Sequence, residues 1–128
     1  MRSFITVFLV LFFWNCNPPK PLTAQEIVDK SYSFYGGALW DNIHLQFQFR
    51  KHRYTLFRKA NQTVYTRSTL ATPTVVDSLF GSGSFRRSEG DQAVALSDSL
   101  QSVYSESVNS VLYFFQIPRV LNDAAVVK

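Results

Sequence analysis

The chain has 128 residues, with 13 Lys or Arg, 9 Asp or Glu, and a formal net charge of +4. This length suits one small domain, and the mild charge without a long basic run argues against nucleic acid as a partner. There is one cysteine, which excludes an internal disulfide.

The first segment of the chain has the layout of a secretory signal. Arg2 supplies a positive charge, and residues 4–14 form an apolar run that only Thr6 interrupts. A helix needs about 20 apolar residues to cross a membrane, so this run is too short for a span. We therefore predict that residues 1–15 are a signal peptide and that the protein is exported.

Cys16 directly follows this segment, and an apolar run that ends in a single cysteine resembles a bacterial lipoprotein signal. In such lipoproteins the cysteine is acylated and becomes the first residue of the mature protein. The resemblance implies a lipid on Cys16, a tether at residues 16–22, and a location at the cell envelope, on the periplasmic side or the outer membrane. The residues before Cys16 are larger than is usual, so an ordinary signal with an unmodified cysteine stays open as the alternative.

After the tether, the sequence predicts one α+β domain at residues 23–128. A helix is expected at residues 23–35, because Thr23 and Glu26 have the spacing of a capping box and apolar residues follow at helical intervals. A glycine pair directly after the helix suits its end, since glycine adopts the left-handed conformation without steric cost.

The next part of the chain predicts an antiparallel sheet. Residues 43–50 alternate between apolar and polar side chains, which is typical of a half-buried strand. The alternation changes parity near residues 51–53, where a bulge or a tight turn would explain it. Further short strands are expected at residues 63–70, 74–80, 85–88 and 93–96. Consecutive short strands joined by tight turns favour a meander.

A second helix is predicted at residues 98–116, with Ser97 or Ser99 as its cap and Pro118 after its end. Its wide apolar stripe suits the covering of a sheet. The expected fold is therefore a curved antiparallel sheet, a partial half-barrel, covered by two helices.

Three stretches resemble a known group of proteins. They are TAQEIVDKSYSFYGGALWDNI at residues 23–43, FQFRKHRYTLFRK at residues 47–59, and LSDSLQSVYSESVNSVLYFFQIPRVLND at residues 96–123. Together with Cys16 they resemble an uncharacterised family of lipoproteins from Bacteroidota-type bacteria, and more distantly the LolA/LolB and LppX-like lipid-carrier lipoproteins. The resemblance implies a cavity for acyl chains between sheet and helices. It also implies a longer protein, and since the chain stops on an apolar segment, we expect the domain to be incomplete at its C-terminus.

The residues expected to line this cavity are Phe47, Phe49, Tyr65, Phe80, Phe85, Leu112 and Phe115. The alternative is that these side chains fill a packed core. A basic stretch flanked by aromatic residues supplies Arg50, Arg53 and Arg58 as candidates to meet an anionic lipid head group. For this stretch the alternative is a solvated strand face.

The sequence thus predicts an envelope lipoprotein that binds a lipid or an acyl chain. Two alternatives remain open, namely a structural or interaction lipoprotein with a packed core, and an enzyme whose site lies in a missing C-terminal part. No catalytic residue, metal site or cofactor is predicted. His44 and His52 are about 26 Å apart on an extended strand, too far to share a metal unless the chain folds back.

Overall fold

The computed structural model describes residues 20–126, so the predicted signal peptide, Cys16 and most of the tether lie outside the described residues. The described elements, in chain order, are α2 (Ala24–Phe34), η2 (Gly37–Asp41), β1 (Asn42–Phe49), β2 (His52–Lys59), β3 (Gln62–Thr69), β4 (Val75–Phe80), β5 (Phe85–Glu89), β6 (Gln92–Val94), α3 (Asp98–Phe115) and η3 (Arg119–Asn122).

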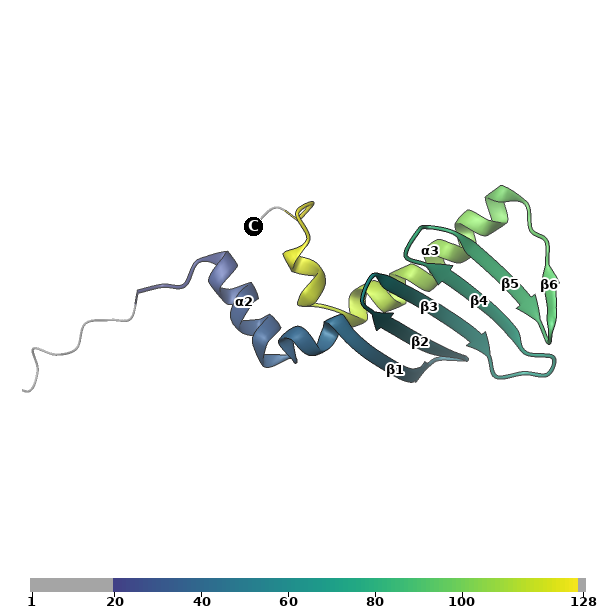
Figure 1. Cartoon of the computed structure of the whole chain (residues 1–128), viewed down its shortest axis with the longest axis horizontal. Helices are drawn as coiled ribbons and strands as arrows, with labels where there is room; N and C mark the ends of the chain where they lie inside the picture. The colour runs from purple at the N-terminus through teal and green to yellow at the C-terminus, as the bar shows by residue number, and fades with distance from the viewer. Residues whose placement is uncertain (1–19, 127–128) are drawn as a thin grey trace, which may run out of the picture.

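The six strands form one open antiparallel sheet in which each strand pairs with its neighbour in the sequence (Figure 1). The predicted α+β class and meander are confirmed. The change of parity after β1 comes from a tight turn at Arg50 and Lys51, where Arg50 has a φ of 55°. Because of this turn, Phe47 of β1 and Tyr54 of β2 are partners in the register, and both strands present their apolar side chains to the same face.

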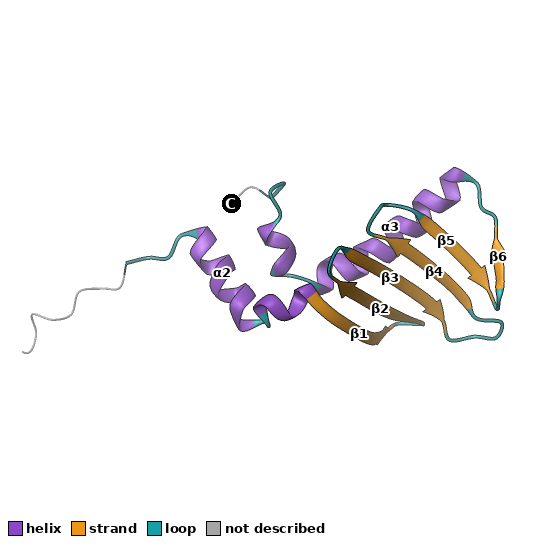
Figure 2. Cartoon of the chain, viewed as in Figure 1, coloured by secondary structure: helices purple, strands orange, loops and turns teal. Residues whose placement is uncertain are grey.

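Helix α3 lies across that face of the sheet (Figure 2). Its buried residues Val108 and Leu112 are one turn apart and share one side of the helix. They form the core together with Trp40, Tyr54 and Leu56. Burying each aliphatic side chain of this core contributes about 1.5–3 kcal/mol, so the packing of α3 on the sheet is a main source of stability.

Helix α2 does not cover the sheet, which corrects the prediction of two covering helices. The predicted capping box is present, since Thr23 and Glu26 each bond the other's backbone N–H. After the helix, Gly36 with a φ of 111° turns the chain into η2, which leads directly into β1. This path leaves α2 beyond the end of the strands and beside η3 (Figure 1). None of its residues is buried, and Phe34 is 84% exposed.

Three charged side chains lie in one row of the sheet beneath α3. Asp77 of β4, which is 2% exposed, pairs with Arg67 of β3 at 2.5 Å and with Arg87 of β5 at 2.6 Å. The Arg87 guanidinium lies 3.6 Å from the centroid of the Tyr104 ring on α3. Burial alone would raise the pKa of Asp77, but hydrogen bonds from Arg87 and Arg67, with their charges, hold the pKa below its usual value.

Candidate functional site

An apolar groove of about 400 Å³ runs between edge strand β1 and helix α3. Its lining residues are Phe47, Phe49, Ser110, Val111, Phe114 and Phe115. The rings of Phe47 and Phe115 are stacked with their centroids 4.4 Å apart, and Phe47 also stacks on Tyr54. This aromatic stack joins strand and helix, so one wall of the groove is held by the core.

The groove leaves large apolar side chains in contact with solvent. Phe114 is 69% exposed, and Phe49 and Phe115 are also exposed. Contiguous exposed apolar surface of this kind is typical of ligand grooves and interaction sites. The local cause is the end of α3, where two successive phenylalanines cannot both point into the core.

A basic cavity of about 420 Å³ adjoins the groove, and the two share Phe49, Ser110 and Val111. The residues that line it are Phe49, Arg50, Lys51, His52, Tyr54, Arg67, Ser107, Ser110 and Val111. Arg50 and Lys51 come from the turn between β1 and β2, His52 from the start of β2, and Arg67 from β3. The arrangement therefore places the apolar groove next to a cluster of positively charged side chains.

The charges of the basic cavity are held in place by neighbouring side chains. The Arg50 guanidinium lies 5.2 Å from the centroid of the Phe49 ring, and Arg67 donates a hydrogen bond to Ser107. Burial lowers the pKa of His52, and the positive charge of Arg67 lowers it further, while Asp77 opposes the shift. Arg67 is already paired with Asp77, whereas Arg50 and Lys51 have no ion pair within residues 20–126, so these two are the charges that a negative group entering the cavity would meet.

The structure brings together three of the seven residues predicted to line a cavity, namely Phe47, Phe49 and Phe115. Leu112 is fully buried in the core. Tyr65 and Phe85 line separate cavities.

Phe80 lies on the opposite face of the sheet. In the register it pairs with Val64, whereas its neighbour Leu79 pairs with Tyr65 on the face that meets α3. Arg86 lies 6.0 Å from the centroid of the Phe80 ring on that far face. A ligand between sheet and helix would not reach this ring.

The three predicted head-group arginines are in three different environments. Arg50 lines the basic cavity, and Arg53 is exposed on the far face, in register with Gln48 and Ser68. Arg58 is only 7% exposed and bonds groups of the core, so it is not available to a head group in the basic cavity.

Arg67 completes the basic cavity and was not among the predicted residues. The sequence could have indicated its position, because Arg67 lies two residues after Tyr65 on β3 and therefore on the same face of the sheet.

The two histidines do not form a metal site. The chain does fold back between them, but the tight turn leaves them on opposite faces, with His44 beside Phe57 and His52 beside Phe49. Within residues 20–126, no group of three or more His, Cys, Asp or Glu could hold a metal ion. Over the same residues, no helix is both long enough and apolar enough to cross a membrane.

A family model described as a family of unknown function, DUF6503, matches residues 2–128. The chain belongs to the DUF6503 family. Comparison with curated proteins found no match. Comparison with solved structures found none either. The family match spans every residue of the groove and of the basic cavity, so both features lie within the DUF6503 region.

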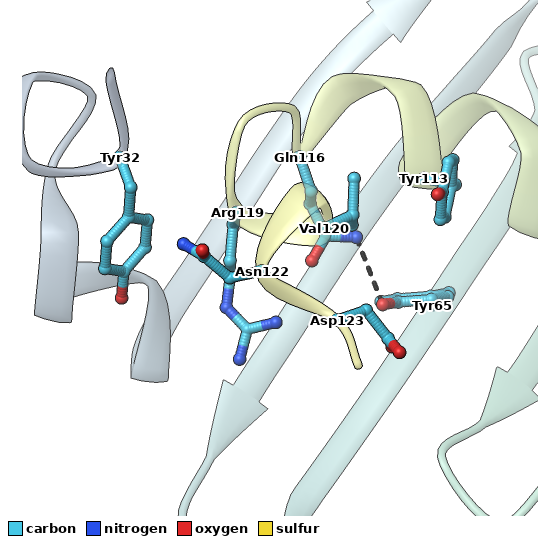
Figure 3. A pocket seen from close by; sticks show the side chains of 8 residues that line it. All are labelled: Tyr32, Tyr65, Tyr113, Gln116, Arg119, Val120, Asn122 and Asp123. Carbon is cyan, nitrogen blue, oxygen red and sulfur yellow. Dashed lines mark hydrogen bonds between the residues drawn. The ribbon is translucent and has the colours of Figure 1, made fainter. Parts of the chain in front are cut away.

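This DUF6503 chain has another cavity, of about 420 Å³, at the C-terminal end of α3 (Figure 3). Its lining residues are Tyr32, Tyr65, Tyr113, Gln116, Arg119, Val120, Asn122 and Asp123. They come from α2, β3, the end of α3, and η3 with its neighbours. We call it the tyrosine cavity, and it shares no lining residue with the groove or the basic cavity.

Proposed function

We propose that this protein binds a lipid, or another ligand with an acyl chain and an anionic head, at the cell envelope. The observation that supports this proposal is the continuity of the apolar groove with the basic cavity through Phe49, Ser110 and Val111. An amphipathic ligand matches this layout, because its apolar chain, which suits the groove, is joined to a charged head, which suits the basic cavity.

The two parts of the site would contribute in different ways. Each methylene buried in the groove stabilises the complex by about 0.8 kcal/mol, which is about a fourfold gain in affinity. Arg50 and Lys51 would donate charge-assisted hydrogen bonds to the head, and arginine suits carboxylate or phosphate oxygens because of its planar fork. The acyl chain then supplies most of the affinity, and the head group fixes the orientation of the ligand.

We also propose that the protein is exported and anchored through a lipid on Cys16. The signal-like segment and the cysteine at its end support this part of the proposal. An anchor of this kind would hold the groove close to a membrane, which is the source of acyl chains. A distant kinship to the LolA/LolB and LppX-like carriers fits the open antiparallel sheet with one helix across it.

Cys16→Ser tests the anchor. We expect this variant to lose membrane attachment in a cell fractionation and to lack the mass of the acyl groups. If it stays in the membrane fraction with an unchanged mature mass, the lipoprotein proposal is wrong.

Native mass spectrometry of the purified full chain tests ligand binding. We expect lysophosphatidylglycerols to bind with an affinity that rises about fourfold per added methylene and then reaches a plateau when the groove is full. Phe114→Ser should weaken binding. Phe34→Ser is the matched control, because Phe34 is also a strongly exposed phenylalanine, 84% against 69% for Phe114, and lies on α2 outside the groove.

The head-group contact has its own pair of variants. Arg50→Asn keeps a residue that tolerates a positive φ and removes the charge, so it should weaken binding of anionic lysophosphatidylglycerol more than binding of zwitterionic lysophosphatidylcholine. Arg86→Asn on the far face is the charge-matched control.

The structure also offers an observation in favour of an interaction lipoprotein. Phe34, Tyr35 and Leu39 are strongly exposed at the end of the molecule where α2 meets η2. A bare protein mass with every lipid, or lipid binding that Phe114→Ser weakens no more than Phe34→Ser does, would reject the lipid-binding proposal and leave this alternative.

A further inference from the structure

Strand β1 is an open edge of the sheet. Among the described strands it pairs with β2 alone, and Figure 2 shows no described segment along its outer side. In an antiparallel sheet, alternate residues of an edge strand direct both backbone groups away from the neighbouring strand. An eight-residue strand such as β1 therefore offers the N–H and C=O groups of about half its residues to another strand.

The devices that normally protect an edge strand are missing from β1. Natural sheets keep their edge strands very short, place charges or prolines on them, or cover them. The opposite edge follows this rule, because β6 has only three residues and the chain then turns into α3. β1 has eight residues, includes no Asp, Glu, Lys, Arg or Pro, and pairs with β2 without a bulge. The sheet thus protects one edge and leaves the other available for pairing.

The sequence of β1 is complementary to itself. When two copies pair antiparallel with Gln46 opposite Gln46, apolar residues lie opposite apolar residues, and uncharged polar residues lie opposite each other. The pairs are Ile43 with Phe49, Leu45 with Phe47, and His44 with Gln48. Directly opposite residues point to the same face of a sheet, so the apolar side chains of both copies stay on the face that α3 covers.

Charges at the two ends of β1 favour this register. Asp41 directly precedes the strand, and Arg50 and Lys51 directly follow it. The same register brings Asp41 of one copy beside Arg50 and Lys51 of the other copy, at both ends of the pair. The Asp41 side chain is 63% exposed, and Lys51 has no ion pair within residues 20–126. A shift of two residues in one direction would place Asp41 opposite Phe49. The same shift in the other direction would place Ile43 opposite Lys51.

We propose that β1 is an interface between two copies of this chain. The two β1 strands pair antiparallel about a twofold axis at Gln46, and two six-stranded sheets become one continuous sheet. Both α3 helices then lie on the same face of the joined sheet, so the apolar grooves of the two copies flank the axis. This inference does not depend on the proposed function, because it uses the outer backbone edge of β1 and no bound ligand.

The oligomeric state of the purified full chain tests this inference. Sedimentation equilibrium should show a reversible equilibrium between monomer and dimer. Gln46→Lys places two positive charges opposite each other at the twofold axis, so it should weaken the dimer at least about tenfold. Gln92→Lys is the matched control, because it makes the same substitution at an exposed position of β6, the other edge strand. This control should leave the equilibrium unchanged.

A disulfide at the twofold axis tests the register. In a Cys16→Ser background, Gln46→Cys should give a cross-linked dimer when oxidised glutathione is added. Directly opposite residues lie about 4.5–5.5 Å apart between Cα atoms, which is within the range that a disulfide spans. Gln48→Cys should not cross-link, because the two copies of residue 48 are four residues out of register, about 13 Å along the strand.

An exchange of charges tests the two ends of the interface. Asp41→Lys and Lys51→Asp should each weaken the dimer, because each brings like charges together. When the two variants are mixed, every Lys at these positions faces an Asp in the heterodimer. The heterodimer should therefore exceed its share in a statistical mixture, and native mass spectrometry separates the three dimers by mass.

Three results would overturn the proposal. The first is a chain that stays monomeric at concentrations up to about 100 μM, which would leave the edge of β1 to a different partner. The second is a dimer that Gln46→Lys weakens no more than Gln92→Lys does. The third is cross-linking of Gln48→Cys that equals the cross-linking of Gln46→Cys. If Gln46→Lys fails to fold, the two cysteine variants still decide the test.

Discussion

Replacing Asp77 by alanine should destabilise the protein more than any surface change. Asp77 is the one acidic member of the row formed with Arg67 and Arg87, and it accepts two hydrogen bonds from each guanidinium. The variant would leave two cations facing each other beneath α3. Breaking a buried pair by removing one partner costs about 3–5 kcal/mol, because a buried charge loses its compensation.

This cost is large compared with the whole stability of a small domain, which is typically about 5–15 kcal/mol. Urea unfolding followed by circular dichroism measures it. With a typical slope of about 1–3 kcal/mol per molar urea, the midpoint should fall by about 2 M. Asp41→Ala is the matched control, since Asp41 pairs with Arg119 but its side chain is 63% exposed. Such a surface pair contributes about 0–1 kcal/mol.

A third variant separates charge from packing. Changing Arg67 and Arg87 to methionine and Asp77 to leucine removes all three charges while filling similar space, and such replacements are often neutral or stabilising. We expect this variant to be close to the original protein in stability. If Asp77→Ala unfolds at the same urea concentration as Asp41→Ala, or if the triple variant is as unstable as Asp77→Ala, uncompensated charge is not the cause.

Three further predictions concern the pH dependence of stability, the pH dependence of binding, and the cap of α2. The pKa of Asp77 in the folded protein lies below its usual 3.8, so the stability that its carboxylate contributes is present above pH 3.8 and is lost as the pH falls through the folded-state pKa. The Asp77→Asn variant lacks this carboxylate, so its free energy of unfolding should change less on acidification. The pKa of His52 is lowered in the free protein, and an anionic ligand in the basic cavity should raise it, so binding should strengthen as the pH falls toward that lowered pKa. The ring signals of His52 in an NMR titration check this, with His44 on the far face as the internal control. Thr23→Ala removes the capping box and should cost about 1 kcal/mol, seen as faster amide hydrogen exchange in α2 while α3 is unchanged.

Local patterns in the sequence were sufficient for most elements of the fold. The Thr23 and Glu26 spacing predicted the start of α2, and the alternation from Ile43 to Phe49 predicted β1 and its inward face. Both signals depend on residues close in the chain, which is why they succeed without knowledge of the fold. The position of α2 beyond the end of the sheet depends on the backbone conformation at Gly36. The sequence pattern did not predict this conformation.

Long-range pairing limited the prediction of the sites. Arg58 follows Tyr54 and Leu56 at the period of a strand, so its parity pointed to the core, yet its partner Gln116 is 58 residues away. A basic residue whose partners are distant in sequence is easily taken for part of a surface patch. The groove was predicted in part, because Phe47 and Phe49 share one strand face and Phe115 was expected on the second helix. The rest of its α3 wall, Ser110, Val111 and Phe114, depends on how α3 docks.

The order of the strands has a consequence for how this chain folds. Every strand pairs with the one before it, so each hairpin closes only a short loop, and the entropy lost on closing each loop is small. Proteins dominated by such local pairings reach the native state faster than those with distant ones. The docking of α3 onto β3, β4 and β5 is the step that joins distant segments. We therefore expect the hairpins to form early and the arrival of this helix to set the folding rate.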